Sequence, residues 1–273
     1  MKIDMHTHSI NSDGTKTPME LAKEAKELNL EMFCITDHNK CAYYEQIEEI
    51  YSKVGIRIIP SIELTVATDP SIQTPRAQMH ILGYGIKDIE KLREKLNYIK
   101  QQNDKECIKC LDKMVQDSIG ITYEDVLRNS AIGKITRGSI MRALVEKEIV
   151  KDLQEAKEVL KQHPKYSINK IAMSYKEGIN LLKEVGALVI LAHPYRPKFA
   201  NLEESILQLK ALGIDGIEVF YKPYTMQRVE ELNQIATKYN LLKTGGTDCH
   251  SKKKRLTLGV EAADLEIVKL LKN

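Results

Sequence analysis

The chain contains no tryptophan and three phenylalanines among its 273 residues. Its core must therefore be built mainly from Ile, Leu, Val, Ala and Met, with twelve tyrosines as the larger side chains. No apolar run approaches the roughly 20 residues of a membrane-spanning helix. Asp4 and two histidines interrupt the N-terminal segment, where a signal peptide would need an apolar stretch. We therefore expect a cytoplasmic protein without a membrane partner.

The charges nearly balance, which limits the classes of partner. There are 41 Lys and Arg residues against 38 Asp and Glu residues, a formal net charge of +3. A protein that coats nucleic acid shows its basic surface in the total, so this balance argues against that class but allows a local basic site. The five cysteines are expected to be reduced thiols. Cys107 and Cys110 lie in a helical pattern and have no second pair to complete a zinc site.

Short apolar runs alternate with helical patterns along most of the chain. The runs are mostly continuous, as in parallel strands covered on both faces. They predict strands at Lys2–His6, Glu31–Thr36, Arg57–Glu63, Met79–Tyr84, Ala187–Ala192, Gly216–Tyr221 and Leu242–Gly246. Helices are predicted at Thr17–Leu28, Tyr43–Val54, Tyr175–Val185, Leu202–Leu212 and Tyr224–Tyr239. This order predicts an α/β fold, a distorted (β/α)7 TIM-like barrel.

The rhythm of strands and helices stops between about Ile89 and Ile171. This interval is rich in Lys and Glu and has a helical pattern. At roughly 80 residues it is too long for a connection within a compact barrel. We therefore predict a barrel formed by residues 1–88 and 172–273, with residues 89–171 as an inserted helical subdomain that covers the C-terminal ends of the strands.

Six of the seven histidines occur where metal ligands would be needed, at or near the ends of predicted strands; His163 does not. In a barrel these ends meet on one face, where catalytic residues gather. His80 is the exception, since it lies at the beginning or middle of its strand. This placement singles out His6, His8, His38, Glu63, His193, Asp248 and His250, and His80 and Asp13, which lies in a Ser-Asp-Gly turn, are candidates beside them.

The spacing of these residues strengthens the interpretation. His6 and His8 are two apart on a strand, so their side chains point the same way. Asp248 and His250 repeat this spacing with mixed ligands. Glu63 ends an apolar strand, where an unpaired carboxylate would be costly unless a metal cluster compensated it. Histidine and carboxylate together are typical ligands of catalytic divalent metals.

Together these segments resemble the PHP family of metal-dependent phosphoesterases (polymerase and histidinol phosphatase), and they occur in family order from end to end. The matching segments are Ile3–Ser9, Ser12–Gly14, Ile35–Asn39, Ile62–Glu63, His80–Tyr84, Ala192–Pro194 and Thr244–His250. Within the family the chain is most similar to the branch that dephosphorylates nucleoside 3′,5′-bisphosphates or trims short RNA ends. That branch carries a helical insert with a segment similar to Lys134–Val145. Tyr224 departs from the pattern, because His is expected there.

The resemblance implies three divalent metal ions, with Mn as the first expectation and Fe, Zn or Mg as alternatives. The first would be held by His6, His8, Glu63 and Asp248, the second by Asp13, His38 and His250, and the third by His80, His193 and the bridging Glu63. Asp4 and Asp37 match motif positions and are expected to orient histidines. Such metals lower the pKa of a bridging water and supply hydroxide, so no Ser or Cys nucleophile is needed. Ser9 and Cys249 are therefore interpreted as bystanders.

Arginines are expected to complete the phosphate site, since a guanidinium fits phosphate oxygens bidentately. Arg137 and Arg196 are the best candidates, and Arg142 is a weaker one. The expected catalytic residues are thus Asp248, His193, Arg137 and Arg196. The basic run Lys252–Arg255 follows directly after His250 and could attract an anionic substrate or be a solvated loop.

The sequence therefore predicts a hydrolase acting on a phosphomonoester, with the 3′-phosphate of a nucleoside 3′,5′-bisphosphate or a short oligonucleotide as the first choice. Histidinol-phosphate phosphatase and exonucleolytic action on RNA or DNA ends remain alternatives, and a non-catalytic metal-binding module is a third possibility. The expected partner is a small phosphorylated substrate or short RNA. No obligate protein partner is predicted.

Overall fold

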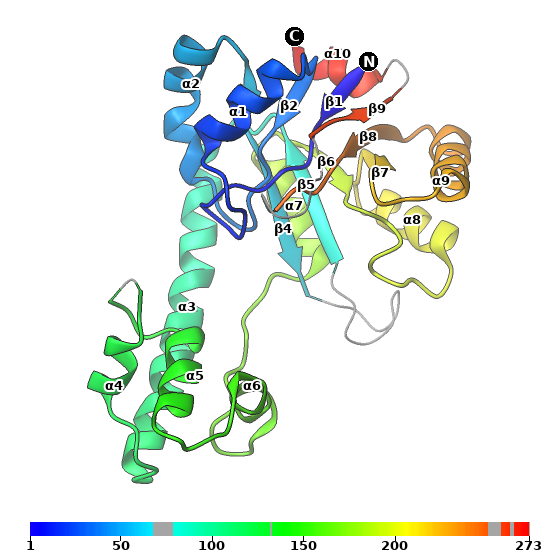
Figure 1. Ribbon diagram of the computed structural model, residues 1–273. Helices are drawn as coiled ribbons and strands as arrows, with labels where there is room; N and C mark the ends of the chain where they lie inside the picture. Colours follow the sequence, from blue (N-terminus) through cyan, green and yellow to red (C-terminus); the bar gives the residue numbers. More distant parts are fainter. Residues whose placement is uncertain (68–78, 132, 251–257, 263–264, 273) are drawn as a thin grey trace. The chain divides into compact units, whose positions relative to one another are not determined.

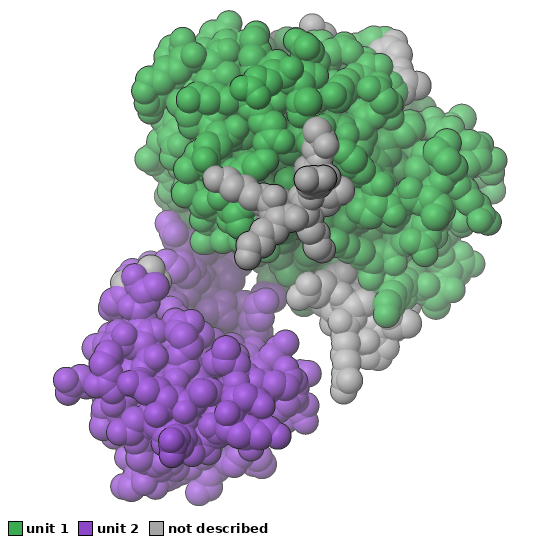
Figure 2. Space-filling model, viewed as in Figure 1, with its two compact units in different colours: residues 1–94, 173–273 green, residues 95–172 purple. Residues whose placement is uncertain are grey.

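The computed structural model contains two β-sheets with helices around them (Figure 1). The structure describes residues 1–67, 79–131, 133–250, 258–262 and 265–272. The basic run Lys252–Arg255 lies outside the described residues. Contacts between Cα atoms divide the chain into unit 1, residues 1–94 and 173–273, and unit 2, residues 95–172 (Figure 2).

The first sheet has the strand order β3-β2-β1-β9, and the second has β4-β5-β6-β7-β8. The strands of the first sheet are β1 (Lys2–Asp4), β2 (Met32–Cys34), β3 (Ile58–Ile59) and β9 (Val260–Glu261). Those of the second are β4 (Ser61–Val66), β5 (Met79–Tyr84), β6 (Leu188–Leu191), β7 (Gly216–Tyr221) and β8 (Leu242–Gly246). The mixed α/β class is therefore confirmed.

The prediction of seven parallel strands is wrong. β5 runs antiparallel to both β4 and β6, and β9 runs antiparallel to β1. The predicted strand Arg57–Glu63 is two strands that belong to different sheets. Pro60 separates them, because proline has no N–H to donate to a ladder.

Hydrogen bonds join the two sheets at two places within the described residues. The Met5 N–H donates to Gly245 O at 3.0 Å, and Thr7 forms a parallel bridge with Cys249. His38 forms a parallel bridge with Glu63. The interior is shared as well, since one apolar cluster contains residues of both sheets, among them Ile3, Met32, Leu82, Tyr84 and Ile190. The ends of the strands from both sheets are thereby held around one interior.

Helices cover the sheets at the five places predicted from the sequence pattern, and α10 at the C-terminal end was not predicted. Unit 1 contains α1 (Pro18–Glu27), η1 (Ala42–Gln46), α2 (Ile47–Val54), α7 (Tyr175–Glu184), α8 (Leu202–Ala211), α9 (Met226–Lys238) and α10 (Glu266–Lys272). The predicted helix start is confirmed, because Thr17 accepts from the Glu20 N–H and Glu20 reaches back to Thr17, with Pro18 at the first position. No helix of the described residues combines the length and apolar character needed to cross a membrane.

Unit 2 is helical and has a core of its own. It contains most of α3 (Ile89–Gln116), then α4 (Tyr123–Arg128), α5 (Arg137–Glu146) and α6 (Leu153–Gln162). Cys107 and Cys110 are free thiols buried in this core beside Leu111, Ile140 and Leu160. They are helix residues that pack, as the pattern around them indicates.

Glycine permits the closest approach between the two sheets. A Cβ on Gly246 of β8 would lie 2.5 Å from His6 Cβ and 2.6 Å from the His6 backbone nitrogen. These atoms belong to the backbone and Cβ of His6, two residues after the end of β1, and they cannot turn away as the end of a long side chain can. The absence of a side chain at Gly246 thus lets β8 deliver Asp248 and His250 beside His6 and His8.

We predict that Gly246→Ala lowers the free energy of unfolding of unit 1 by about 1–3 kcal/mol, because the added methyl group overpacks a rigid contact. Gly83→Ala on β5 is the matched control. Its Cβ would meet Leu182 Cδ2 at 2.6 Å, the end of a flexible side chain that can move. Chemical denaturation of both variants measures the difference. An equal or smaller loss for Gly246→Ala would contradict the close-approach argument.

Candidate metal centre

Glu63 is the residue around which the predicted ligands gather. It lies on β4 and is fully buried. Its Oε2 is 3.2 Å from His6 Nε2 and 3.1 Å from His8 Nε2. Its Oε1 is 2.8 Å from His80 Nδ1 and 3.1 Å from His193 Nε2. With His38, whose Nδ1 is 3.1 Å from Oε2, this one buried carboxylate faces imidazoles from four different parts of the chain.

The structure brings all nine residues singled out by the sequence into unit 1 around this carboxylate. Their potential ligand atoms form three overlapping groups, each with its atoms within 4.8 Å of one another. These groups are His6, His8, Glu63 and Asp248; His8, Asp13, His38 and His250; and His38, Glu63 and His80. The first group has the expected composition. The second gains His8, and the third contains His38, whereas His193 reaches the centre through its contact with Glu63 Oε1.

The donor atoms in the middle of this cluster have no hydrogen-bond partners among the described residues. They are buried and include His6 Nε2, His8 Nε2, His38 Nδ1, Glu63 Oε2 and Asp248 Oδ1. Buried polar atoms without partners are costly, and each calls for a physical explanation. Divalent cations bound between these nitrogen and oxygen atoms would satisfy them together. The arrangement therefore fits a metal cluster of imidazole and carboxylate ligands.

The carboxylates and the histidines shift each other's pKa in the metal-free centre. Burial alone would raise the pKa of Glu63, but His6 and His193 outweigh it and hold that pKa well below its usual value. Burial lowers the pKa of His38 to about 4. For His8 burial is opposed by the nearby carboxylates of Asp248 and Glu63, each 3.1 Å from Nε2, which raise its pKa to about 9. The centre thus keeps its carboxylates ionised, as metal ligands must be.

One side of the cluster is open to solvent. The Asp13 side chain is 54% exposed, and its Oδ1 lies 3.4 Å from His250 Nε2 and 3.8 Å from His8 Nδ1. The rings of His8 and His250 stack with their centroids 4.0 Å apart. A substrate can approach from this side, because the other members of the cluster are buried or half-buried.

The backbone at two of these residues is strained. His193 has a φ of 29° and Asp248 has a φ of 53°, in the left-handed region that residues with a Cβ rarely adopt. Such conformations cost about 1–3 kcal/mol each and persist where surrounding contacts fix them. The Glu218 carboxylate fixes the first by accepting from the His193 N–H at 2.7 Å. The second is held where Asp248 N donates to His6 O at 2.7 Å.

Asp4 and Asp37 act on the backbone and hydroxyl groups of the loops, which corrects the expectation that they orient histidine rings. Asp4 accepts from the N–H groups of His6, Thr247 and Gly259 and from Thr247 Oγ1. Burial raises the pKa of Asp4 to about 6, although these hydrogen bonds oppose the shift. Asp37 accepts from Ser9 and Ser12 in the loop that carries Asp13. The two residues therefore shape the segments that present ligands. Ser9 is engaged by Asp37, in keeping with a bystander role.

The sequence interpretation assigned no role to Glu218 and Tyr221. Glu218 is fully buried on β7 and its Oε1 lies 3.0 Å from His6 Nδ1, so it fixes the ring that turns Nε2 toward Glu63. Tyr221 donates its hydroxyl to Asp248 Oδ2 at 2.9 Å, which leaves Oδ1 for the cluster. The available signal for Glu218 was the same as for Glu63, a carboxylate within an apolar strand.

The structure separates the candidate arginines. Arg196 Nη2 lies 2.9 Å from Asp248 Oδ2, so this guanidinium borders the cluster and is half-exposed. Arg137 lies in unit 2, where its Nη2 donates to Lys157 O at 3.2 Å and its buried Nε has no partner among the described residues. Arg142 donates from Nε and Nη2 to Asn129 O in the same unit, so its guanidinium has a structural partner there. The Tyr224 hydroxyl accepts from the Tyr195 N–H at 2.9 Å.

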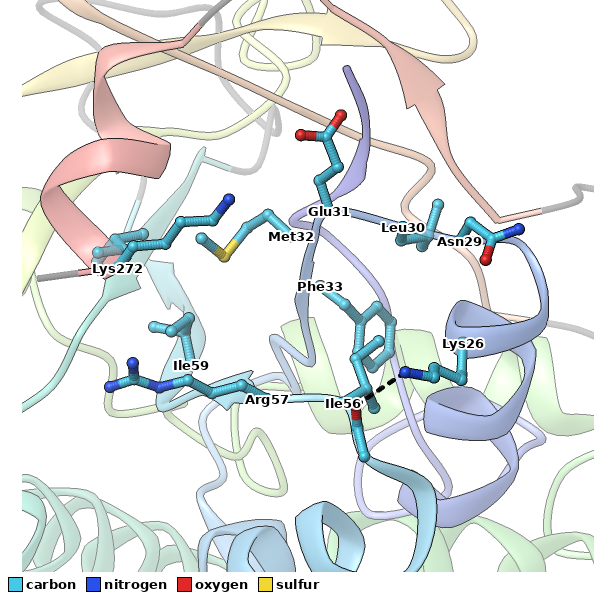
Figure 3. Close-up of a pocket in the computed structure, with 12 residues that line it drawn as sticks. Lys26, Asn29, Leu30, Glu31, Met32, Phe33, Ile56, Arg57, Ile59 and Lys272 are labelled. Carbon is cyan, nitrogen blue, oxygen red and sulfur yellow. Dashed lines mark hydrogen bonds between the residues drawn. The ribbon is translucent and has the colours of Figure 1, made fainter.

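A pocket of about 390 Å³ lies away from this centre (Figure 3). It borders the beginning of β2 at Met32 and Phe33, whereas His38 follows the end of that strand. Lys26 donates to Gly55 O at its edge. None of the nine residues lines it, so the chemistry of the donor atoms, rather than this cavity, identifies the candidate site.

Comparisons with known proteins agree with this geometry. A 5′-3′ exoribonuclease of Haemophilus influenzae is 27% identical over 91% of this chain and 90% of its own length. A 3′,5′-nucleoside bisphosphate phosphatase of Chromobacterium violaceum is 25% identical over 91% of this chain and 87% of its own length. The crystal structure of a protein of Bifidobacterium adolescentis, described as a metal-dependent phosphoesterase, superposes with a TM-score of 0.67 at 26% identity and covers 98% of this chain and 93% of its own.

The match to the PHP domain extends over residues 4–173, which is more than half of the chain. It includes six of the nine residues of the centre, namely His6, His8, Asp13, His38, Glu63 and His80. The resemblance first recognised in the histidine motifs is thus confirmed, and the chain belongs to the PHP domain family.

Proposed function

We propose that this protein hydrolyses a phosphomonoester at a cluster of three divalent metal ions, with a phosphorylated nucleotide as substrate. The single observation that carries the proposal is the group of buried, unpartnered donor atoms around Glu63. Family membership gives metal-dependent phosphoester hydrolysis as the reaction type. The nine proposed ligands are those predicted from the sequence, and Mn is the first candidate metal.

Bound cations would lower the pKa of a water molecule and neutralise the oxygens of the phosphate. The protein contributes the positions of the groups. Glu218 holds His6, Tyr221 and Arg196 hold Oδ2 of Asp248, and Asp37 holds the loop before Asp13. We propose that the two sheets act together as one distorted barrel around this centre. Five free, buried thiols support the cytoplasm as the proposed location.

The proposed reaction at the substrate is removal of the 3′-phosphate of a nucleoside 3′,5′-bisphosphate, and the Chromobacterium relative supports this choice. In this proposal the helical insert, residues 89–171, supplies Arg137 to the second phosphate. The buried Arg137 Nε without a partner is the supporting observation.

Trimming of RNA from its 5′ end is the second candidate, supported by the Haemophilus relative. An assay for mononucleotides released from short RNA distinguishes these two functions, because only RNA trimming produces them.

The first prediction concerns the metals. Chelation should abolish phosphate release, and added Mn should restore it. His8→Ala and Asp248→Ala should each lower kcat on the order of a hundredfold, the scale of losing one electrostatic contact in a transition state. His163→Ala is the matched control and should retain activity, because its ring stacks on Tyr166 in unit 2. Full activity of a metal-stripped sample would end the proposal.

The second prediction concerns Glu218, which contacts a proposed ligand but lies outside the ligand set. Glu218→Gln keeps the shape and removes the charge that fixes the His6 ring. We expect metal affinity to fall roughly 10–100-fold, the usual cost of losing a group that orients a ligand. Metal titration of the stripped protein measures this affinity. Glu230→Gln, on the exposed face of α9, should bind metal as the wild type does, and equal affinities for both variants would contradict the role of Glu218.

The third prediction concerns Arg137. If it binds a phosphate that does not react, Arg137→Ala should reduce kcat/KM for a nucleoside 3′,5′-bisphosphate far more than for the corresponding 3′-monophosphate. The expected loss is about 1.5–3 kcal/mol, the value of a charge-assisted hydrogen bond, or roughly ten- to a hundredfold.

Arg128→Ala is the control for Arg137, because Arg128 is a half-exposed arginine of the same unit that pairs with Asp125. Thermal unfolding of both variants checks that unit 2 remains folded. An equal loss on both substrates would place Arg137 at the reacting phosphate. Unchanged kinetics on both would remove it from the site.

A further inference from the structure

A continuous series of aromatic rings leads outward from the metal centre. The ring of Tyr221 lies 5.6 Å from that of His193, and the ring of Tyr224 lies 4.8 Å from that of Tyr221. Tyr195 follows, with its ring centroid 5.2 Å from that of Tyr224. Tyr221 is 3% exposed, whereas Tyr224 and Tyr195 are half-buried. The series therefore begins inside the protein and ends at its surface.

Arg228 completes the outer end of this series. It lies on the first turn of α9, with its guanidinium carbon 4.7 Å from the ring centroid of Tyr195 and 5.8 Å from that of Tyr224. The side chain is exposed and makes no ion pair with a carboxylate of the described residues. Cation–π attraction to the two rings thus holds the guanidinium in place.

Hydrogen bonds fix the rings and occupy their hydroxyl groups. The Tyr224 hydroxyl accepts from the Tyr195 N–H, and the Tyr195 hydroxyl donates to Glu231 Oε2 at 2.5 Å. The Tyr221 hydroxyl donates to Asp248. What these residues offer to a ligand is therefore mainly the faces and edges of aromatic rings set at 87° to each other, the guanidinium, and the O–H of Tyr224, which accepts but does not donate within the described residues. Such surface binds nucleobases by stacking and accepts any base, because every base has a π face.

We propose that Tyr195, Tyr224 and Arg228 form a stacking surface that binds the base of a nucleotide substrate and selects nucleoside phosphates over sugar phosphates. This inference depends on the proposed function, since it concerns the part of the substrate that does not react. The path from Asp248 through Tyr221 to Tyr224 places the surface beside the metal centre. Tyrosine at position 224 provides the middle ring of the surface, where histidine was expected.

The test compares a nucleoside 3′-monophosphate with its counterpart that lacks the base. Tyr224→Leu and Arg228→Lys keep bulk and charge respectively but remove the flat surface. Each should lower kcat/KM for the nucleotide roughly five- to a hundredfold, mostly through KM, and leave the base-free substrate unchanged. Tyr239→Leu is the control, because Tyr239 pairs with Lys238 at the other end of α9 with a cation–ring distance of 5.0 Å.

Binding of both compounds, measured by calorimetry, keeps the two proposals distinguishable. If the wild type hydrolyses neither compound, the proposed function fails, and the stacking surface is still judged by whether the nucleotide binds more tightly than its base-free counterpart. The stacking surface is refuted if the wild type hydrolyses the nucleotide and the base-free compound equally well, or if the variants affect both compounds equally. Tyr195, Tyr224 and Arg228 would then serve only to pack residues 193–199 against α9.

Discussion

The structure of unit 1 depends on one buried carboxylate that faces several imidazoles. Glu63 has no exposure to water, and both of its oxygens lie within about 3 Å of histidine nitrogens from four other segments. A single ion pair of this kind would repay little of its desolvation cost. Here the remaining donor atoms lie close enough together to share bound cations. Such cations would neutralise the carboxylates and bind the lone pairs of the imidazoles, and so offset the desolvation cost. The position of Glu63 within β4, rather than at the strand end expected from the sequence, thus determines where the other elements must place their ligands.

The surrounding structure converts this requirement into fixed positions. Gly246 lets β8 approach β1, and Asp4 ties the backbone of both strands through Thr247 and His6. Glu218 holds a left-handed His193 by its N–H and the His6 ring by Nδ1. These groups are buried, and each contacts a ligand or the backbone beside it. Substitution of Gly246, Asp4 or Glu218 would therefore displace the metal-binding atoms but leave them present. Substitution of a ligand would remove such an atom.

Much of this centre could be predicted from the sequence, and the reasons for the exceptions are physical. Most of the histidine motifs follow strand ends, so local pattern together with the family resemblance singled out the nine residues that the structure brings around Glu63. The direction of β5 was not predictable, because a continuous apolar run looks the same in parallel and antiparallel strands. Pro60 was visible, but its effect of sending β3 and β4 into different sheets depends on packing partners. Tyr221 and the ring series could not be found from spacing, since Tyr195 and Tyr224 meet only when β6 and β7 lie side by side.

The connectivity of the two units also bears on how the chain folds as it is synthesised. Unit 2 draws its whole core from one continuous stretch, so it can fold once residue 172 has left the ribosome. Unit 1 cannot, because β1 pairs with β9 near the end of the chain and Thr7 bridges to Cys249. Its N-terminal half must wait with apolar strands exposed until the last fifth of the protein emerges, the period in which association with other nascent chains is a hazard. The small helical unit would then be the first part of the molecule to reach its native state.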